Sequence, residues 1–335
     1  MAWTVRLRRT SWRTSIILAL FLPLVLGSMA RAGRWSEDDF AHRVPVTFAV
    51  DPHQATVVGA LQTYVVQDGD TLLDVGRYFD LGYNEMVGAN PGVDPWRPPP
   101  GEVITIPTEY VLPASSYQGV VVNIPEMRLY YFKTTGGARG GGGLTVTTYP
   151  VGLGRDDWRT PQGSFKIRGK TENPTWVIPE SIRAEHIQDR GDARTFIAGG
   201  DPDNPLGAYR LELTLPLYGL HGSNMPWGVG MQVSHGCIRL YNEDIALLFH
   251  DVRIGTPGEF VYQPIKLGTR DGLVYIEVHD DIYSLRTNVE DEAARLLERS
   301  GWMDRVDEGR LHRALSQRSG VPVVISRDAV ETAAR

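Results

Sequence analysis

The chain has 335 residues, of which 42% are hydrophobic and 22% are charged. This composition excludes a disordered chain, and the length predicts two or three domains with a sizeable core. The formal net charge is −6, which excludes a protein that binds nucleic acid through a basic surface. Residues 1–32 carry five arginines and no acid, so their removal would leave a net charge of −11.

The N-terminal segment predicts export. Its basic start precedes an apolar run over residues 16–26, and Ala30-Arg31-Ala32 offers a small-x-small cleavage site. The alternative is a transmembrane anchor, but the run is shorter than the roughly 20 residues that span a bilayer, and it contains Pro23. We therefore predict a cleaved signal peptide over residues 1–32.

Cys237 is the only cysteine of the chain. No intramolecular disulfide can form, so an exported form must depend on its core for stability. No cysteine lies near the cleavage site, which excludes lipid attachment to a mature N-terminal cysteine. An unpaired cysteine in an exported protein is a candidate reactive thiol.

Residues 33–62 are expected to form a lead-in segment, with a strand over residues 44–50. The pattern then sharpens: a strand over 64–66 is followed by a helix that opens with a capping box at Thr71 and Asp74. A second helix over 84–89 and a strand over 103–107 complete the order strand, helix, helix, strand.

Residues 63–108 resemble a LysM module. The resemblance rests on the run from Tyr64 to Leu72, on Asn90, and on Ile104-Thr105-Ile106-Pro107. It implies binding to glycans that contain N-acetylglucosamine, such as peptidoglycan. The candidate glycan-binding residues are Gly69, Asp70, Thr71 and Asn90. The alternative is a small structural domain that has the same element order.

Residues 109–117 are expected to be a linker, and the region beyond them predicts mainly strands. We expect strands over 120–124, 127–132, 144–149, 209–215, 217–220 and 259–262, with helices over 180–186 and 242–249. The glycine-rich segment 136–143 predicts a hairpin loop, because no GK[ST] follows it as in a phosphate-binding loop.

Two loops of this region are candidate walls of a site. The long irregular segment that begins at residue 173 is typical of a lid or a substrate wall. Arg155, Trp158 and Arg159 lie in a turn, where they either face a ligand carboxylate or are solvated. Residues 264–335 predict a C-terminal strand and helical extension, with a strand over 273–278, helices over 288–300 and 307–319, and no assignable motif.

The stretch from His221 to Arg239 holds the lone cysteine and two of the eight histidines. Twelve residues separate His221 from Ser234, and their glycines and proline predict a loop that brings His221 beside Cys237. An imidazole that takes the thiol proton makes such a pair capable of acyl transfer. A carbonyl could approach the N–H groups of Gly236 and Cys237, which would then form an oxyanion hole.

Two other interpretations of the same residues remain open. His221, His235 and Cys237 could bind zinc, although a closed site needs a fourth ligand and no HExxH or CxxC accompanies them. The cysteine could also be buried and inert, with both histidines satisfied by backbone partners. Acyl transfer uses every unusual residue of the stretch, and we favour it.

His-Gly-Ser-Asn at 221–224 and Ser-His-Gly-Cys-Ile-Arg-Leu at 234–240 are similar to the signature of the L,D-transpeptidase catalytic domain, also called YkuD-like. Residues 122–131 and 154–163 add to the resemblance, which covers residues 118–263. With the preceding LysM-like part, the chain resembles the periplasmic branch of this family in Gram-negative bacteria. The resemblance implies a largely β sandwich with the cysteine at one end, and no metal or other cofactor.

The resemblance also implies roles for individual residues. Cys237 would attack the carbonyl that follows the third residue of a tetrapeptide stem and release D-alanine. His221 would be the base, oriented by the carbonyl of Gly222. The oxyanion hole and substrate pocket would include Ser234, His235, Gly236, Arg239 and Asn224. A guanidinium at Arg239 would also lower the thiol pKa, and the alternative role for it is a structural ion pair.

Peptidoglycan stem peptides and glycan are therefore the expected partners, and the acyl acceptor stays open. Another stem peptide would give a cross-link, a lysine of an envelope lipoprotein would give an anchor, and water would give a carboxypeptidase. A wall-binding protein with an inactive catalytic domain is a further alternative, although all three signature side chains are present in this sequence.

Overall fold

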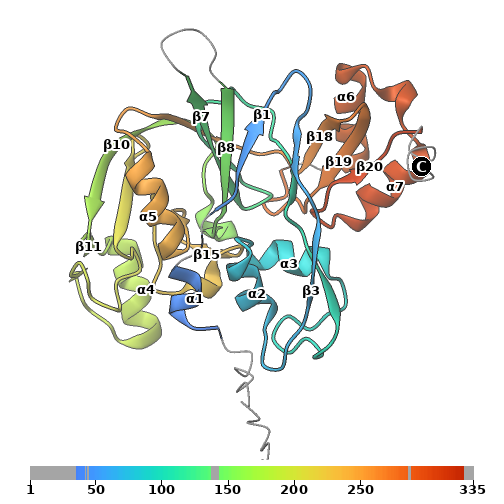
Figure 1. Ribbon diagram of the computed structural model, residues 1–335. Coiled ribbons are helices and arrows are strands. Elements are labelled where there is room, and N and C mark those ends of the chain that lie inside the picture. Colours follow the sequence, from blue (N-terminus) through green and yellow to red (C-terminus); the bar gives the residue numbers. More distant parts are fainter. Residues whose placement is uncertain (1–34, 42, 44, 137–142, 286–287, 328–335) are drawn as a thin grey trace, which may run out of the picture.

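The computed structural model describes residues 35–41, 43, 45–136, 143–285 and 288–327 (Figure 1). The predicted signal peptide and most of the predicted glycine-rich hairpin loop lie outside these ranges. None of the helices within them is long and apolar enough to cross a bilayer. The described chain is mainly β, as the sequence predicts.

Nine strands of the described chain form the main sheet, which runs across the centre of Figure 1. In spatial order the strands are β1 (Thr47–Val50), β8 (Gly143–Pro150), β7 (Arg128–Thr135), β6 (Gly119–Asn123), β17 (Pro257–Val261), β10 (Gly163–Glu172), β13 (Tyr209–Leu213), β14 (Gly219–His221) and β16 (Ile238–Arg239).

Strand β10 joins the two halves of this sheet. Its first residues, Gly163 to Lys166, pair with β17. Its residues from Ile167 onward pair with β13, with an irregularity between Ile167 and Gly169. Buried side chains of both halves and of helix α5 (Asn242–Asp251) form one hydrophobic core. The half that ends in β14 and β16 carries the signature stretch.

Strands β6 and β7 are buried on both faces. Val120, Val122 and Leu129 belong to the core shared with α5, whereas the alternating Val121 and Tyr130 belong to a second core. Side chains alternate between the faces of a strand, so a continuous apolar run is expected where both faces are covered. The second core is completed by residues from the part of the chain that resembles LysM.

That part has the predicted order of elements: β3 (Gln62–Val65), α2 (Leu72–Tyr78), α3 (Tyr83–Ala89) and β4 (Val103–Ile106). We call it the βααβ unit. Strands β3 and β4 pair antiparallel, and Thr71 caps α2 by accepting a 3.0 Å hydrogen bond from the Asp74 N–H. Leu72, Val75 and Met86 of this unit pack in the second core, against the main sheet.

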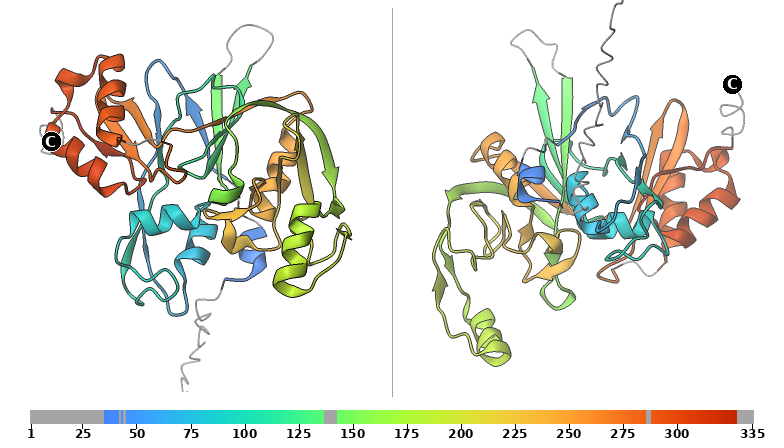
Figure 2. Two further views of the ribbon diagram at one scale, coloured as in Figure 1. Left: turned by 180° about the vertical axis from the view of Figure 1, so that it is seen from behind. Right: turned by 60° about the horizontal axis from the view of Figure 1, so that its bottom comes forward.

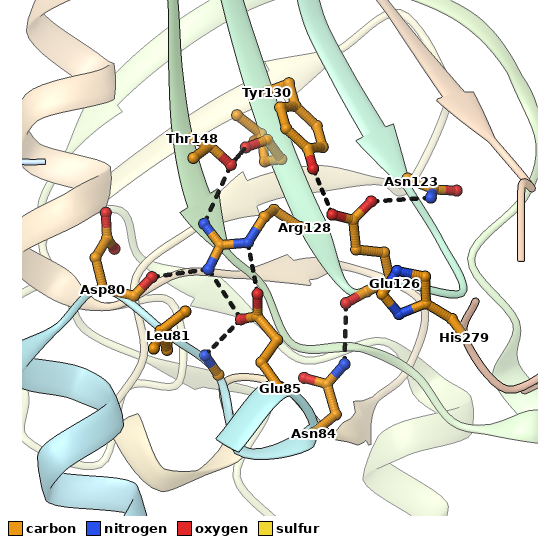
Figure 3. A network of polar contacts seen from close by, with 12 residues as sticks. Asp80, Leu81, Asn84, Glu85, Asn123, Glu126, Arg128, Tyr130, Thr148 and His279 are labelled. Carbon is orange, nitrogen blue, oxygen red and sulfur yellow. Dashed lines mark hydrogen bonds and ion pairs between the residues drawn. The ribbon is translucent and has the colours of Figure 1, made fainter. Parts of the chain in front are cut away.

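A buried ion pair fastens the βααβ unit to β7 (Figure 3). The Arg128 guanidinium lies 2.7 Å from Glu85 of α3, and it also donates to the carbonyl of Asp80 at 2.8 Å. Asn84 donates to the carbonyl of Glu126 at 2.9 Å. Because Arg128 is fully buried, the unit is a fixed part of the structure rather than a separate tethered module.

The expected lead-in segment and linker are both part of the fold. Strand β1 of the lead-in extends the main sheet by pairing with β8, and α1 (Glu37–Ala41) lies beside the βααβ unit, where Glu37 pairs with Arg77. Strand β2 (Val57–Gly59) pairs with β5 (Glu109–Val111), which lies in the expected linker. Their register brings Val57 opposite Val111.

The C-terminal extension forms a small α/β layer with its own core (Figures 1 and 2). It contains the sheet β18 (Ile265–Arg270), β19 (Leu273–Val278) and β20 (Val323–Val324), the helices α6 (Val289–Ser300) and α7 (Glu308–Gln317), and the short η3 (Met303–Arg305). Only β19 and the two long helices were predicted. Tyr275 of β19 contacts Val57 and Val111, which places the extension against the β2–β5 ribbon.

The irregular segment expected to form a lid makes a small lobe beside the end of the main sheet (Figure 2). It contains α4 (Glu180–Arg190) and the paired strands β11 (Trp176–Val177) and β12 (Phe196–Ile197), packed around Ile178, Ile182 and Ile197. Four further short elements are the parallel pair β9 (Leu153–Gly154) and β15 (Gln232–Ser234) and the turns η1 (Asp156–Trp158) and η2 (Pro226–Gly228).

Candidate active site

The signature residues meet because β14 and β16 pair in parallel. Leu220 lies opposite Ile238, and His221 lies opposite Arg239. Cys237 directly precedes β16, so the loop that follows His221 returns the thiol to the same end of the sheet, as the glycine-rich spacing predicts. Both His221 and Cys237 line a cavity of about 230 Å³.

His221 is held as a neutral imidazole with one orientation. Its Nδ1 lies 2.7 Å from the carbonyl oxygen of Gly222, and an Nδ1–H donor there leaves the Nε2 lone pair free to accept a proton. Burial, together with the charge of nearby Arg239, lowers the pKa of His221 to about 3. The hydrogen bond to Gly222 thus fixes which ring nitrogen faces away from the backbone.

Cys237 is partly exposed in the cavity, and its thiol is also neutral at rest. Burial raises the pKa of the Cys237 thiol, against the opposing effects of the Gly219 backbone N–H and of the charges on Arg210 and Arg239. Sγ lies 3.5 Å from the carbonyl oxygen of Leu217, to which the thiol donates. These pKa directions favour a thiol beside a neutral imidazole over a preformed thiolate–imidazolium pair.

The turn before Cys237 is held by Ser234. Its hydroxyl donates to the carbonyl of Cys237 at 2.6 Å and accepts the N–H of Gly236 at 3.1 Å. Gly236 has φ +102°, and a Cβ there would lie 2.7 Å from the Tyr218 ring, so a side chain would strain this turn. The Gly236 N–H that was expected in the oxyanion hole is thus already engaged. The described residues give the Cys237 N–H no such partner.

His235 lies in the wall of the cavity and is held from the lid. Its Nε2 is 2.8 Å from Glu185 Oε2 of α4, and Glu185 also accepts from Arg155 at 3.0 Å. Hydrogen bonds from Arg155 and His235 lower the pKa of Glu185 to about 2. The rings of Trp158 and His235 form a T-shaped contact, with 5.2 Å between ring centroids.

A second cavity of about 370 Å³ adjoins the first. The two share Trp176, Pro205, His235 and Arg239 in their walls. Asn224 was expected in the substrate pocket beside Cys237. It lines the second cavity instead, where its amide donates to the carbonyl of Asp203 at 3.2 Å.

Several known proteins are similar to this chain over most of its length. Residues 117–262 match the family model described as the YkuD L,D-transpeptidase catalytic domain. Two proteins of Escherichia coli (strain K12) are similar over 91% of their own lengths: probable L,D-transpeptidase ErfK/SrfK is 35% identical over 84% of this chain, and probable L,D-transpeptidase YbiS is 34% identical over 83%. A third, probable L,D-transpeptidase YcfS, is 31% identical over 97% of this chain and 98% of its own length.

This chain belongs to the L,D-transpeptidase family. L,D-transpeptidases act on peptidoglycan. In this L,D-transpeptidase the structure brings Cys237, His221, Ser234, His235 and Arg239 to one cavity, with Gly222 and Gly236 directly beside them in the chain.

Arg155, Trp158 and Arg159 share one turn but lie in different surroundings. Trp158 lines the cavity, and Arg155 pairs with Glu185 of the lid. Arg159 pairs with Asp156 at 2.6 Å on the surface and is absent from the described cavity wall. Arg239 forms no ion pair with the described acidic residues, so the structural ion pair considered for it is not found.

Sequence reasoning missed several residues of this cavity. Arg210 and Leu217 lie on the approach to His221, and Trp176 lies on the lid side. Alternation in this strand separates Arg210 from the buried Leu211 and Leu213. Only the strand register places it opposite His221, and the sequence does not give that register. Glu185 was missed because its contact with His235 joins residues that are 50 positions apart in the sequence.

The expected glycan-binding residues of the βααβ unit hold the unit together. Asp70 accepts the Tyr64 hydroxyl and the Gln67 N–H, both at 2.8 Å. Asn90 donates to the carbonyls of Met86 and Thr105 and accepts the Thr105 N–H. With Thr71 capping α2, these polar atoms are engaged internally. Gly69, at φ +84°, forms the exposed turn beside them.

The zinc alternative is not supported by the arrangement of the described residues, because the ligand atoms of His221, His235 and Cys237 do not form a group with the spacing of metal ligands. A different group of described residues, Glu126, Glu277 and His279, has the spacing of metal ligands. The ammonium of Lys266 lies 2.7 Å from both of these carboxylates and satisfies the buried charge. We therefore assign that cluster a structural role at the base of the C-terminal extension.

Proposed function

We propose that this chain is a peptidoglycan L,D-transpeptidase of the periplasm, with Cys237 as nucleophile and His221 as base. The observation that carries the proposal is the pairing of β14 with β16, which opens the thiol and the imidazole onto one cavity. The N-terminal segment, whose basic start precedes an apolar run, supports export.

The first half-reaction forms an acyl-enzyme. His221 Nε2 takes the thiol proton, and Sγ attacks the carbonyl that follows the third residue of a tetrapeptide stem. The Cys237 N–H donates to the resulting oxyanion. The C–N bond to D-alanine then breaks, and His221 returns the proton to the leaving amine. Because both groups are neutral at rest, proton transfer accompanies substrate attack rather than preceding it.

The second half-reaction transfers the acyl group to an amine. The amine gives a proton to His221 and attacks the thioester carbonyl, and Sγ leaves as the thiol by recovering that proton. The second cavity shares the wall formed by His235 and Arg239, and it supplies space for an acceptor beside the thioester. A stem peptide or a lipoprotein lysine would occupy it, and water is the alternative acceptor.

The βααβ unit is proposed to bind the glycan through its exposed turn at Gly69 and the neighbouring loop that carries Trp96. Leu72 donates to the carbonyl of Pro95 at 2.8 Å, which holds this loop beside the turn. Trp96 is 55% exposed, and an exposed aromatic ring offers an apolar face for a sugar.

Replacing Cys237 with Ala should abolish D-alanine release from a purified tetrapeptide muropeptide, while sedimentation with peptidoglycan stays unchanged. Trp96→Ala should do the reverse, with release from the soluble muropeptide retained and sedimentation weakened. Retained release by Cys237→Ala would refute the acyl-enzyme. Mass spectrometry of products formed with muropeptides, a lysine-bearing acceptor peptide or water alone would identify the acceptor.

A further inference from the structure

The cavity around Cys237 contains cations without anions. Two arginines, Arg210 and Arg239, line it together with His221 and His235, and none of its described lining residues is Asp or Glu. Burying a cation without a partner is costly. A cavity that keeps two such groups therefore points to a negatively charged ligand.

The sheet register places the two arginines on either side of the proposed base. Arg210 of β13 is the cross-strand partner of His221, and His221 is in turn the partner of Arg239 on β16. Residues that lie opposite one another across adjacent strands point to the same face. The three side chains thus form one row across three strands, next to the thiol.

The guanidinium groups have unused donors. Nε of Arg210 and both Nε and Nη1 of Arg239 are buried and form no hydrogen bond within the described chain. Arg43 and Arg183 also have a buried Nε without a hydrogen bond, but each pairs with a described acid, as do Arg128 and Arg77. Arg210 and Arg239, which are half-buried, pair with none of the described acids. Buried donors are normally satisfied, so the open donors beside Cys237 mark where a ligand would complete the network.

We propose that Arg210 is a specificity-determining residue of this L,D-transpeptidase, which together with Arg239 binds a carboxylate of the donor stem peptide. The proposal rests on the proposed function. A guanidinium offers donors in a planar fork that matches a carboxylate. The recognised chemistry is thus an anionic donor held next to the bond that is cleaved.

Two carboxylates of a stem peptide could supply this charge. One is the terminal carboxylate on the leaving residue, and the other is a side-chain carboxylate at the acylated residue. Amidation removes the charge of either while preserving its size. Donors that are amidated at one position at a time therefore distinguish the two sources.

The test compares Arg210→Gln and Arg210→Lys with the unmodified enzyme, on donors with free and amidated carboxylates. We expect Arg210→Gln to lower kcat/KM for the free donor by about 10- to 100-fold, mainly through KM, since charge-assisted hydrogen bonds are worth about 1.5–3 kcal/mol. One amidated donor should show the same loss with the unmodified enzyme and no further loss with Arg210→Gln. Arg210→Lys should restore part of the activity.

Arg168→Gln is the matched control, because Arg168 is an exposed arginine that pairs with Glu212 at 3.1 Å on the neighbouring strand surface. Arg168→Gln should leave kcat/KM unchanged for the free and the amidated donors. An equal loss on all donors with Arg210→Gln would overturn the proposal, since that outcome describes a structural role. The proposal would also be overturned if the unmodified enzyme cleaved both amidated donors as fast as the free donor.

A binding measurement separates this proposal from the proposed reaction. Calorimetry with Cys237→Ala measures donor affinity without turnover, and adding Arg210→Gln should weaken binding of the free donor by the same 10- to 100-fold. Unchanged affinity in the double variant would reject the role of Arg210. If Arg210→Gln weakens affinity in this background but the unmodified enzyme releases no D-alanine, the role of Arg210 is retained and the proposed reaction is rejected.

Discussion

The neutral state of both reacting groups is the main electrostatic feature of the site at the scale of single residues. His221 is buried against the Gly222 carbonyl and has its pKa lowered to about 3, while burial raises the pKa of Cys237. A cysteine thiolate forms only as the pH rises through the thiol pKa. In the resting enzyme, Cys237 should therefore be a protonated thiol rather than a thiolate.

Alkylation of Cys237 by iodoacetamide tests this state. In the free enzyme, the rate should increase with pH through an inflection above about 8.5, the pKa of free cysteine. His221→Ala should leave this profile nearly unchanged but lower turnover by about 10²- to 10⁴-fold, as expected for loss of a general base. A rate that is already maximal at pH 6 and falls in His221→Ala would instead reveal a preformed ion pair.

At the scale of elements, the carboxylate of Glu185 joins helix α4 to the turn that precedes Cys237. Glu185 contacts both His235 and Arg155, and the lid lobe has only a small core of its own. Exposed ion pairs contribute about 0–1 kcal/mol, so their loss should change the order of the lid more than global stability.

Glu185→Gln should therefore raise hydrogen exchange in α4 while the melting temperature changes by no more than a few degrees. Exchange in α5, which packs in the main core, should stay unchanged. Glu180→Gln is the control, because Glu180 lies on the same helix and pairs only with Arg183 on the surface. Equal exchange in the two variants would show that Glu185 does not hold the lid.

The elements also show what the sequence could predict. The turn chemistry of Thr71 and the alternation in residues 127–132 set local structure, so the start of α2 and the first part of β7 were predicted, whereas β7 runs on to Thr135. Strand β18 was missed although it pairs with β19 across the two-residue turn Asp271-Gly272, a local hairpin signal that the sequence does carry. The fold-back to Cys237 followed from glycine spacing, whereas Arg210 and Glu185 enter the site through strand register and lid packing.

At the scale of the whole molecule, the βααβ unit and the catalytic sheet share one buried core. Deleting residues 63–108 would expose Val121, Tyr130 and Phe132 and leave Arg128 without Glu85. Loss of glycan binding after such a deletion would thus be confounded by unfolding. Point substitutions at exposed positions are the appropriate probes of that function.

Arg128→Ala should lower the free energy of unfolding by about 3–5 kcal/mol, because it leaves Glu85 as a buried charge without its partner. Urea unfolding should report this loss as a single transition, followed equally by signals from the βααβ unit and from the main sheet. Arg168→Ala, at an exposed pair, should cost no more than about 1 kcal/mol. Two separate transitions would indicate that the unit and the sheet are independent.

The burial of β6 and β7 on both faces has a consequence for how the enzyme meets its polymer. A glycan held by the Gly69–Trp96 surface and a stem peptide lying at Cys237 would be separated by a fixed span, since the βααβ unit shares a buried core with the main sheet and is joined to it by the Arg128–Glu85 ion pair. We therefore expect the enzyme to select stem peptides that lie at one distance and one orientation from the glycan strand that it binds.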